Sequence, residues 1–331
     1  MALSEPPIEI ALLIYPQVQL AAVYGLTDLF GFADQFARDR MASEQPCFRI
    51  SHWNIEPAGT DLTRVYESIP GGQAVPNVVI IPPSLKVPPT ACDFACLLTW
   101  LRGCHEQGST LASVCAGAFI LAETGLLAGR QATTHWTCAT ELAEQFPSIN
   151  VDAGRILIDE GDIVTAGGIM AWTDLGLRLV DRLLGPAVMM DTAKFLLIDP
   201  PGREQRHYSA FSPPMNHGDT SILKTQRRLQ TETVRELATT DMAAWAGLEV
   251  RTFLRRFQKA TGLKPIEYWQ HVRIERARHL LETTLEPVEK VAWDVGYEDA
   301  GSFRKVFIKI TGLTPVEYRK RFGSFQLQAA S

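Results

Sequence analysis

The chain has 331 residues, of which 46% are hydrophobic and 21% charged, as in ordinary globular proteins and unlike disordered, collagen-like or coiled-coil chains. This length suits two domains better than one. No run of about 20 apolar residues is present, so we expect no membrane span. No basic residue precedes Arg38, so we expect no secretory leader. Six cysteines without a CxxC pair predict reduced thiols and a cytoplasmic protein.

Charge is divided unevenly along the chain. Residues 1–220 hold 13 basic and 24 acidic residues, a net charge of −11. Residues 221–331 hold 19 basic and 13 acidic residues, a net charge of +6. Because a basic segment attracts polyanions, we expect only the second part to meet nucleic acid.

The first part alternates segments typical of strands and of helices. Continuous apolar runs predict buried strands at Ile8–Tyr15, Phe48–Trp53, Val78–Ile81, Leu111–Val114, Ile156–Ile158 and Ile163–Ala166. Helical spacing predicts helices at Leu20–Phe36, Asp93–Glu106, Ala118–Leu127, Trp172–Leu184 and Ala187–Leu197. This alternation predicts an α/β sandwich with an open, mostly parallel sheet. We expect it to cover residues 1–199, followed by a Pro- and Gly-rich linker at 200–220 and an all-α domain at 221–331.

The all-α part is predicted to contain two helix-turn-helix motifs. Their helices are expected at Met242–Trp245 with Val250–Ala260, and at Val288–Val295 with Ser302–Thr311. The segment 253–270 repeats as 303–320, sharing Phe, Thr-Gly-Leu, Pro, Glu and Tyr. A helix over Pro265–Thr283 would separate the repeats by about 28 Å. Since this approaches the ~34 Å turn of B-DNA, both second helices could enter successive major grooves on one face.

The tail resembles the AraC-type DNA-binding domain over about Ile222–Phe322. Matching positions are Ala292, Gly296, Tyr297, Phe303, Lys305, Phe307, Gly312, Thr314, Pro315, Tyr318 and Arg319. The resemblance implies double-stranded DNA as partner. It also implies base contacts by Arg251, Leu254 and Arg255 in the first motif and by Ala300, Gly301, Arg304 and Lys305 in the second.

The residue types in these two sets differ in what they can read. Arginine binds guanine edges through two hydrogen bonds, whereas Ala300 and Gly301 offer only close approach, so the second motif is expected to anchor phosphates more than read bases. Arg256 and Lys309 are further DNA-binding candidates, for which a solvated helix face is the alternative.

A cysteine stands where a strand is expected to meet a helix. Small residues surround Cys115, including Ala116 and Gly117, and permit the sharp turn that lifts a nucleophile above a sheet. The helix dipole and the free N–H groups at such a turn favour a thiolate and can also hold an anionic ligand. Cys115 is therefore predicted to be the most reactive of the six cysteines, at the sheet edge where α/β proteins bind ligands.

The segment 113–136 (SVCAGAFILAETGLLAGRQATTHW) resembles the PfpI-type branch of the class I glutamine amidotransferase-like superfamily, in the form found in GlxA-type regulators, over about Ile8–Leu197. The resemblance implies an acid after the first strand, for which Asp28 is the nearest candidate. Ala116 occupies the position of the peptidase histidine, and residues 82–84 (PPS) replace a Gly-rich oxyanion turn, so hydrolysis is disfavoured. His135 is the candidate substitute base, giving Cys115, Asp28 and His135 as the catalytic set if the protein is an enzyme.

These features predict a ligand-responsive transcription regulator that is a homodimer through its α/β domain and needs no metal or cofactor. Its effector, by family resemblance an amino acid or a quaternary amine, is expected near Cys115, Ala116, Gly117, Asp28, His135 and Trp136. Two alternatives stay open. One is a Cys-dependent amidase, hydratase or glyoxalase-like enzyme tethered to DNA, and the other a constitutive DNA-binding protein with a purely dimerising first domain.

Overall fold

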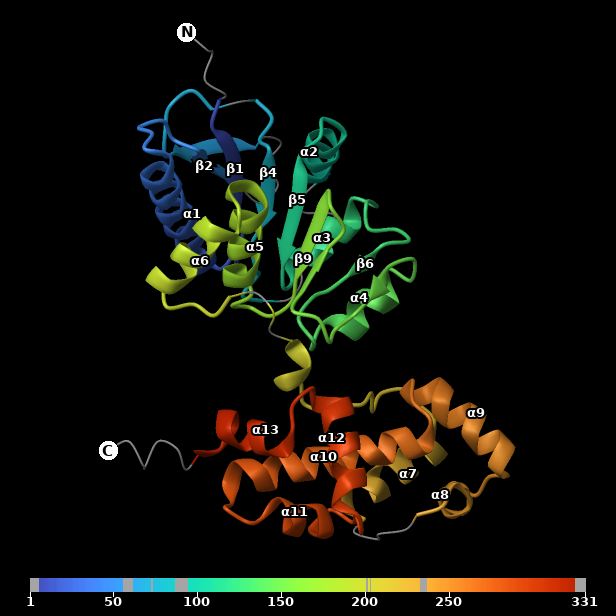
Figure 1. The fold of residues 1–331 in the computed structure, drawn as a ribbon. Coiled ribbons are helices and arrows are strands. Elements are labelled where there is room, and N and C mark those ends of the chain that lie inside the picture. The colour runs from blue at the N-terminus through green and yellow to red at the C-terminus, as the bar shows by residue number, and fades with distance from the viewer. Residues whose placement is uncertain are drawn as a thin grey trace. The chain divides into compact units, whose positions relative to one another are not determined.

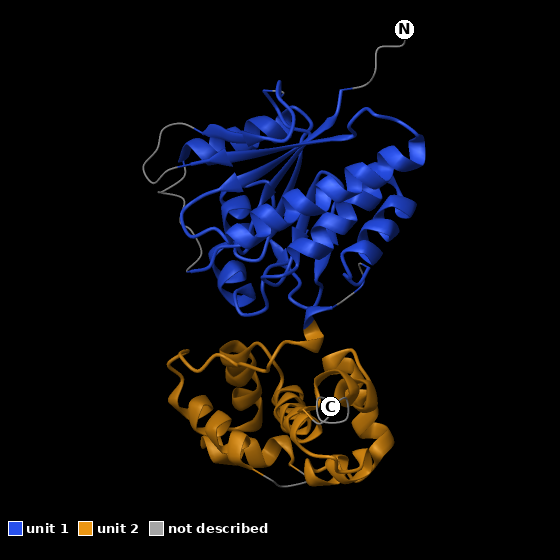
Figure 2. Cartoon of the chain, turned by 90° about the vertical axis from the view of Figure 1, so that its left-hand side faces the viewer, with its two compact units in different colours: residues 1–205 blue, residues 206–331 orange. Residues whose placement is uncertain are grey.

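The computed structural model describes residues 6–55, 62–72, 74–86, 95–200, 202, 204–232 and 237–324. The chain divides into two compact units, residues 1–205 and 206–331 (Figure 2). The division falls inside the segment 200–220 that the sequence suggests as a linker. Gln205 is buried in the first unit and His207 in the second. These residues of the predicted linker therefore belong to the two folded units.

A seven-stranded sheet forms the centre of the first unit, in the order β3-β2-β1-β4-β5-β9-β8 (Figure 1). The strands are β1 (Ile8–Ile14), β2 (Phe48–Asn54), β3 (Thr63–Glu67), β4 (Val78–Ile81), β5 (Thr110–Val114), β8 (Leu157–Asp159) and β9 (Ile163–Ala166). The five central strands are parallel, whereas β3 and β8 pair antiparallel at the edges. A separate small ladder joins β6 (Gln131–Ala132) to β7 (Asn150–Val151). The predicted mostly parallel sheet is confirmed.

Helices cover both faces of this sheet. Helices α1 (Leu20–Met41), α5 (Trp172–Leu184) and α6 (Pro186–Phe195) pack against one another (Figure 1). Helices α2 (Ala95–Glu106) and α3 (Gly117–Glu123) pack together against β5, and α4 (Ala139–Gln145) packs on β7. The step from β1 to β2 runs across the sheet in the opposite direction to the step from β4 to β5, so right-handed crossovers place α1 and α2 on opposite faces. The strand order therefore reverses between β1 and β4, and the carboxyl ends there form the ligand crevice typical of such sheets.

One strand of the seven-stranded sheet was not predicted, and the ends of several predicted elements differ from the structure. The polar strand β3 has exposed side chains at three of its five positions and so carries no apolar run that could announce it. Helix α3 ends at Glu123 rather than Leu127 because Gly125 adopts a positive φ of 82°, which interrupts the helix. Asp93, the predicted start of the helix found as α2, lies outside the described residues.

The second unit is all-helical, which confirms the predicted second part. Its helices are α7 (Thr220–Thr231), α8 (Thr239–Ala246), α9 (Val250–Thr261), α10 (Pro265–Thr283), α11 (Val288–Asp294), α12 (Ala300–Thr311) and α13 (Pro315–Phe322). They build two separate hydrophobic cores, and α10 belongs to both. Its first half supplies Tyr268, Trp269 and Val272 to one core, and its second half supplies Ile274, Ala277 and Leu281 to the other. Among the described residues, every helix is too short or too polar to cross a lipid bilayer.

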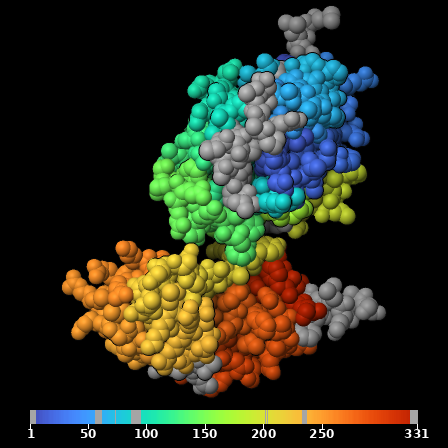
Figure 3. Space-filling view, turned by 180° about the vertical axis from the view of Figure 1, so that it is seen from behind, coloured from blue at the N-terminus to red at the C-terminus, as the bar shows by residue number. Residues whose placement is uncertain are grey.

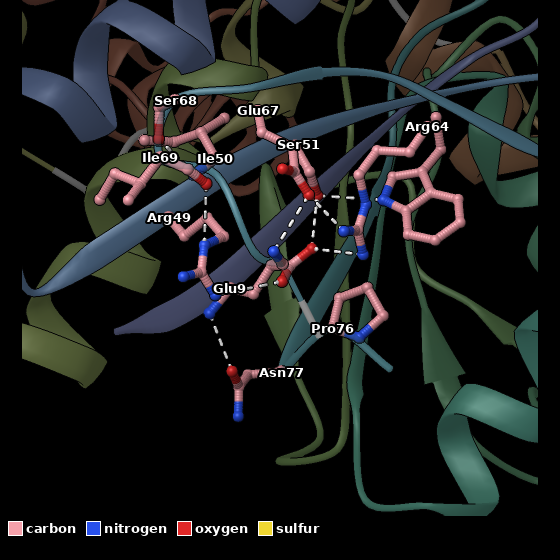
Figure 4. A network of polar contacts seen from close by, with 12 residues as sticks. Glu9, Arg49, Ile50, Ser51, Arg64, Glu67, Ser68, Ile69, Pro76 and Asn77 are labelled. Atoms are coloured by element: carbon pink, nitrogen blue, oxygen red, sulfur yellow. Dashed lines mark hydrogen bonds and ion pairs between the residues drawn. The ribbon is translucent and has the colours of Figure 1, made fainter. Parts of the chain in front are cut away.

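A buried carboxylate joins the first three strands of the sheet order (Figure 4). Glu9 on β1 is fully buried and accepts a hydrogen bond from Ser51 Oγ at 2.8 Å. Its carboxylate pairs with Arg64 of β3 at 3.2 Å and with Arg49 of β2 at 3.8 Å. Arg64 also lies 4.6 Å from the ring centroid of Trp53. Because this edge strand has few buried apolar side chains, these charge contacts hold β3 in register.

We expect Glu9→Ala to destabilise the first unit by about 3–5 kcal/mol, because removing the carboxylate leaves the buried guanidinium of Arg49 without its ion-pair partner among the described residues. Urea unfolding followed by circular dichroism measures this loss. Glu44→Ala is the matched control, since Glu44 is exposed in the loop between α1 and β2, and it should change stability by less than about 0.5 kcal/mol. Equal stability of the two variants would contradict a structural role for the Glu9 network.

Candidate nucleic-acid interface and cysteine elbow

The two helix-turn-helix motifs, α8–α9 and α11–α12, have the same internal construction. Phe253 and Phe257 of α9 and Phe303 and Phe307 of α12 are fully buried. Each second helix ends at a glycine in the left-handed region, Gly262 or Gly312. Just before it, Thr261 and Thr311 each donate a hydrogen bond of 2.8 Å to the carbonyl of the phenylalanine four residues earlier. The repeat therefore reflects packing, and it leaves the opposite face of each helix open.

The residues predicted to read DNA lie on these open faces. Arg251, Leu254 and Arg255 are exposed on α9, and Arg304, Lys305 and Lys309 are exposed on α12. Figure 3 shows, in orange, side chains of the region around residue 250 on the outer surface of the second unit. Ala300 and Gly301 are half-buried at the start of α12, where the Asp299 carboxylate accepts hydrogen bonds from the backbone of Gly301 and Ser302. Contact of these residues with DNA stays a prediction.

The candidate cations differ in how far they are already engaged. Arg256 donates two hydrogen bonds, of 2.9 and 2.7 Å, to the carboxylate of Asp219, which also caps the start of α7. These bonds from Arg256 hold the pKa of Asp219 below its usual value. Arg304 pairs with Glu289 of α11 at 2.5 Å. Arg256 therefore ties α9 to α7 and is not simply solvated. Arg251, Arg255, Lys305 and Lys309 make no hydrogen bond or salt bridge within the described part of the chain.

The elbow around Cys115 has the predicted sharp turn. Cys115 directly follows β5 with a positive φ of 55°, and its N–H donates to the carbonyl of Ala166 at 2.8 Å. A Cβ on Gly117 would lie 2.6 Å from the carbonyl oxygen of Ile81 and 2.9 Å from that of Pro82. Since β4 passes this close to the start of α3, only glycine fits at position 117.

The predicted thiolate is wrong for Cys115. The side chain is 6% exposed, and burial raises the pKa of the Cys115 thiol to about 11. The N–H of Ala116 acts in the opposite direction on this pKa, and the neighbouring Cys138 raises it further. Helix α3 has only seven residues, so its dipole is too weak to offset desolvation. Cys115 is a neutral thiol at physiological pH.

The other predicted pocket residues fall into two groups. Thr134 donates a hydrogen bond of 2.7 Å from its hydroxyl to the carbonyl of Cys115, so the loop carrying His135 and Trp136 starts beside the elbow. The His135 and Trp136 rings lie 5.6 Å apart, and burial lowers the pKa of His135. Asp28 is exposed on α1. Within the described residues no hydrogen bond joins Cys115 to Asp28 or to His135, and His135 Nδ1 instead lies 2.7 Å from Thr137 Oγ1.

Two polar residues that the sequence interpretation missed stand at the strand-order reversal. Tyr15 directly follows β1, and its hydroxyl donates to the carbonyl of Pro82. Gln19 precedes α1, is 9% exposed, and donates its N–H to the carbonyl of Pro83 at 2.8 Å. Its side-chain carbonyl oxygen is buried without a hydrogen-bond partner in the described residues, and its amide approaches only the sulfur of Met170, at 3.9 Å. The position of Tyr15 at the end of an apolar strand was a signal that could have found it, whereas no local signal marks Gln19.

Comparison with known proteins gives two family matches. Residues 242–321 match a helix-turn-helix domain family, and residues 69–182 match the DJ-1/PfpI family. The HTH-type transcriptional regulator GlxA of Rhizobium meliloti is 30% identical over 229 residues, covering 68% of this chain and 70% of that protein. The HTH-type transcriptional regulator GbdR of Pseudomonas aeruginosa is 26% identical over 67% of this chain, and the match spans only 61% of that protein. An isonitrile hydratase of Pseudomonas putida is 27% identical, over 64% of this chain and 82% of that protein.

The raised pKa of Cys115 predicts slow alkylation at neutral pH. Because the thiolate is the nucleophile, its reaction with iodoacetamide should accelerate as pH rises, with a midpoint near pH 11. Mass spectrometry of tryptic peptides would follow Cys115 and the less buried Cys138 in the same sample. A midpoint below pH 8 for Cys115 would contradict the neutral thiol.

Arg256→Ala should lower the thermal midpoint of the second unit, because it removes both bonds to Asp219. The depressed pKa of Asp219 contributes stability that is fully present above its unfolded pKa of about 3.9 and is lost as pH falls through the lower folded pKa. The variant should therefore lose less stability than the wild type between pH 5 and pH 3. Arg255→Ala, on the exposed face, is the control. An unchanged pH profile in Arg256→Ala would refute the tie.

Proposed function

Because the chain belongs to the GlxA-type helix-turn-helix transcription regulators, which join a DJ-1/PfpI domain to an AraC-type DNA-binding domain, we propose that α9 reads bases, that α12 mainly anchors phosphates, and that the first unit senses a small molecule at the cysteine elbow. The protein is a DNA-binding transcription regulator. Three parts of this function are proposed here: the different roles of α9 and α12 on DNA, the sensing site, and homodimerisation through the first unit.

The different roles proposed for the two motifs rest on the exposed arginines of α9, which have no hydrogen-bond partner within the described residues. Arg251 and Arg255 present two guanidinium groups to solvent, and each has the geometry to bind a guanine edge through two hydrogen bonds. On α12 the only arginine, Arg304, is paired with Glu289, and the helix starts with Ala300 and Gly301. The exposed lysines of α12, Lys305 and Lys309, suit phosphate oxygens as point charges.

The sensing site is supported by polar groups that converge at one sheet edge. Gln19 places a buried carbonyl acceptor at the reversal of strand order, where it would accept a hydrogen bond from a ligand N–H. The N–H of Gly117, the first residue of α3, would donate to an anionic or carbonyl oxygen of the ligand. A ligand with both features resembles an amino acid. The neutral thiol of Cys115 and its separation from an acid or base favour binding over turnover.

Helix α10 sets the expected distance between the two motifs. Its observed bounds, Pro265–Thr283, are the predicted ones, and a 19-residue helix is about 28 Å long. Because both ends of α10 are buried in separate cores, the two second helices are held at a defined separation. This supports binding to successive major grooves on one side of a duplex.

Arg255→Ala is expected to weaken binding to a specific site by roughly 1–3 kcal/mol and to relax the preference at one base position. Lys309→Ala should instead weaken binding to all sequences about equally and reduce the salt dependence of affinity. Fluorescence anisotropy with duplexes from the region upstream of this protein's own coding sequence, at several salt concentrations, would measure both. Uniform weakening by Arg255→Ala would make it a phosphate contact, and an affinity independent of salt would overturn the interface.

A thermal-shift screen with amino acids and quaternary amines tests the sensing site. A ligand present at 100 times its Kd should stabilise the native first unit by about 2.7 kcal/mol. Gln19→Leu should abolish the shift, whereas Gln145→Leu, at an exposed position of α4, should preserve it. A panel without any stabilising ligand would favour a constitutive DNA-binding protein. Turnover of a ligand that is lost in Cys115→Ser would favour the enzyme.

A further inference from the structure

Gln205 holds the loop beside the elbow with a single side chain. It is 2% exposed, and its amide nitrogen donates to Thr133 Oγ1 at 3.1 Å, to the carbonyl of Thr134 at 2.8 Å and to that of Arg155 at 2.8 Å. Its side-chain oxygen accepts from the N–H of Trp136 at 3.2 Å. All four contacts belong to the first unit. The position of residues 133–136 therefore depends on whether the Gln205 side chain is docked.

The same residue is the last one of the first unit. Its own N–H donates to the carbonyl of Gly154 at 2.9 Å. The next two residues are held by the second unit: the carbonyl of Arg206 accepts from Arg278 at 3.0 Å, and His207 Nδ1 lies 2.7 Å from the carbonyl oxygen of Thr311 at the end of α12. One short 3-10 helix, Gln205–His207, contains both attachments. While Gln205 is docked, each of the residues 205, 206 and 207 is hydrogen-bonded to one of the two units.

The docked side chain is connected to the proposed sensing site through Thr134. The carbonyl of Thr134 accepts from Gln205, and its hydroxyl donates to the carbonyl of Cys115. A ligand lying against Cys115, His135 or Trp136 would thus meet the loop that Gln205 holds. Such a ligand shifts the docking equilibrium only by the difference in its affinity for the two arrangements of this loop.

We propose that Gln205 is a clasp that sets the length of the tether between the sensing and DNA-binding units, and that the effector controls it. This inference rests on the proposed function of the first unit. Upstream of the clasp, Ile198 is a residue whose backbone is held inside the first unit, by a bond of 2.9 Å to Ala193. Undocking that also breaks the Gln205 N–H bond to Gly154 and the bridge between Arg155 and Glu204 would lengthen the tether by up to seven residues, 199–205, or about 23–25 Å.

A longer tether changes which DNA sites a dimer can occupy. Two DNA-binding units joined through short tethers reach only half-sites of matching separation, whereas longer tethers tolerate more separations at a lower effective concentration. An effector that favours the undocked loop would broaden the accepted spacing, and one that favours the docked loop would narrow it. Gln205 is on this account a positioning residue, and it does not itself need to touch the ligand or the DNA.

Gly167 offers a way to open the clasp without changing Gln205. A Cβ at this position would lie 1.9 Å from Gln205 Nε2, so Gly167→Ala should expel the side chain. The control is Gly103→Ala in α2, where an added Cβ meets nothing within 4 Å. A third variant, Thr134→Val, cuts the bond between the loop and Cys115. Its control is Thr137→Val, whose hydroxyl is exposed and contacts His135 and Cys138.

The experiment measures the full-length protein without ligand or DNA, by small-angle X-ray scattering and by the rate of tryptic cleavage between residues 199 and 207. Gln205→Ala and Gly167→Ala should each increase the maximum dimension by up to about 25 Å and raise the cleavage rate at least tenfold, with both units still folded by circular dichroism. The double variant should equal the single variants, because both act on one contact. Thr134→Val should shift both readouts in the same direction, and the controls should match the wild type.

Unchanged scattering and cleavage in Gln205→Ala would overturn the clasp, even if Gly167→Ala does not fold. A change in Gln205→Ala without any change in Thr134→Val would overturn its connection to the elbow. Because neither DNA nor effector is present, these outcomes are separate from failure of the proposed function, which the anisotropy and thermal-shift experiments detect.

Discussion

The apolar contacts of α10 with two separate cores are the constraint on which the DNA-binding unit depends. Each core is small, and each contains three buried side chains from one half of this helix. The two motifs are consequently joined by buried packing rather than by a loop, and their separation follows from the length of one helix. The outer faces of α9 and α12 are then free to differ. One carries unengaged arginines, and the other carries lysines, an arginine already paired with Glu289, and two of the smallest side chains.

At the elbow, burial outweighs the electrostatic effects that a strand-to-helix turn suggests. The N–H of Ala116 acts to lower the pKa of Cys115, but desolvation acts more strongly and in the opposite direction. Burial also leaves the side-chain carbonyl of Gln19 without a hydrogen-bond partner among the described residues. Both features support the ligand-binding role that we propose for the first unit. The sequence similarity of this chain to the matched isonitrile hydratase therefore does not by itself indicate the chemistry of the site.

Sensing and DNA binding are connected in this chain by very few residues. In the loop after β6, the hydroxyl of Thr134 donates to the carbonyl of Cys115, and the carbonyl of Thr134 accepts a hydrogen bond from Gln205. His207, two residues after Gln205, contacts the end of α12. Hydrogen bonds of this kind contribute about 1 kcal/mol each, and an amide with two N–H groups and one oxygen makes about three at a time, which gives a docking equilibrium that a bound effector can shift. The clasp is thus compatible with ordinary ligand affinities and needs no large rearrangement of either core.

The sequence by itself determined the sheet, the two helix-turn-helix motifs and the bounds of α10, because apolar periodicity and the repeated Phe, Gly and Pro positions are local signals. It also placed Cys115 at a turn, since small residues surround it. Only the tertiary structure decided the protonation of Cys115, the engagement of Arg256 by Asp219 and the exposure of Asp28, since each depends on what lies beside the side chain. Gln19 and Gln205 were invisible for the same reason. A glutamine has no periodicity of its own, and its importance comes from partners 50 to 151 positions away or, for one carbonyl oxygen, from having none among the described residues.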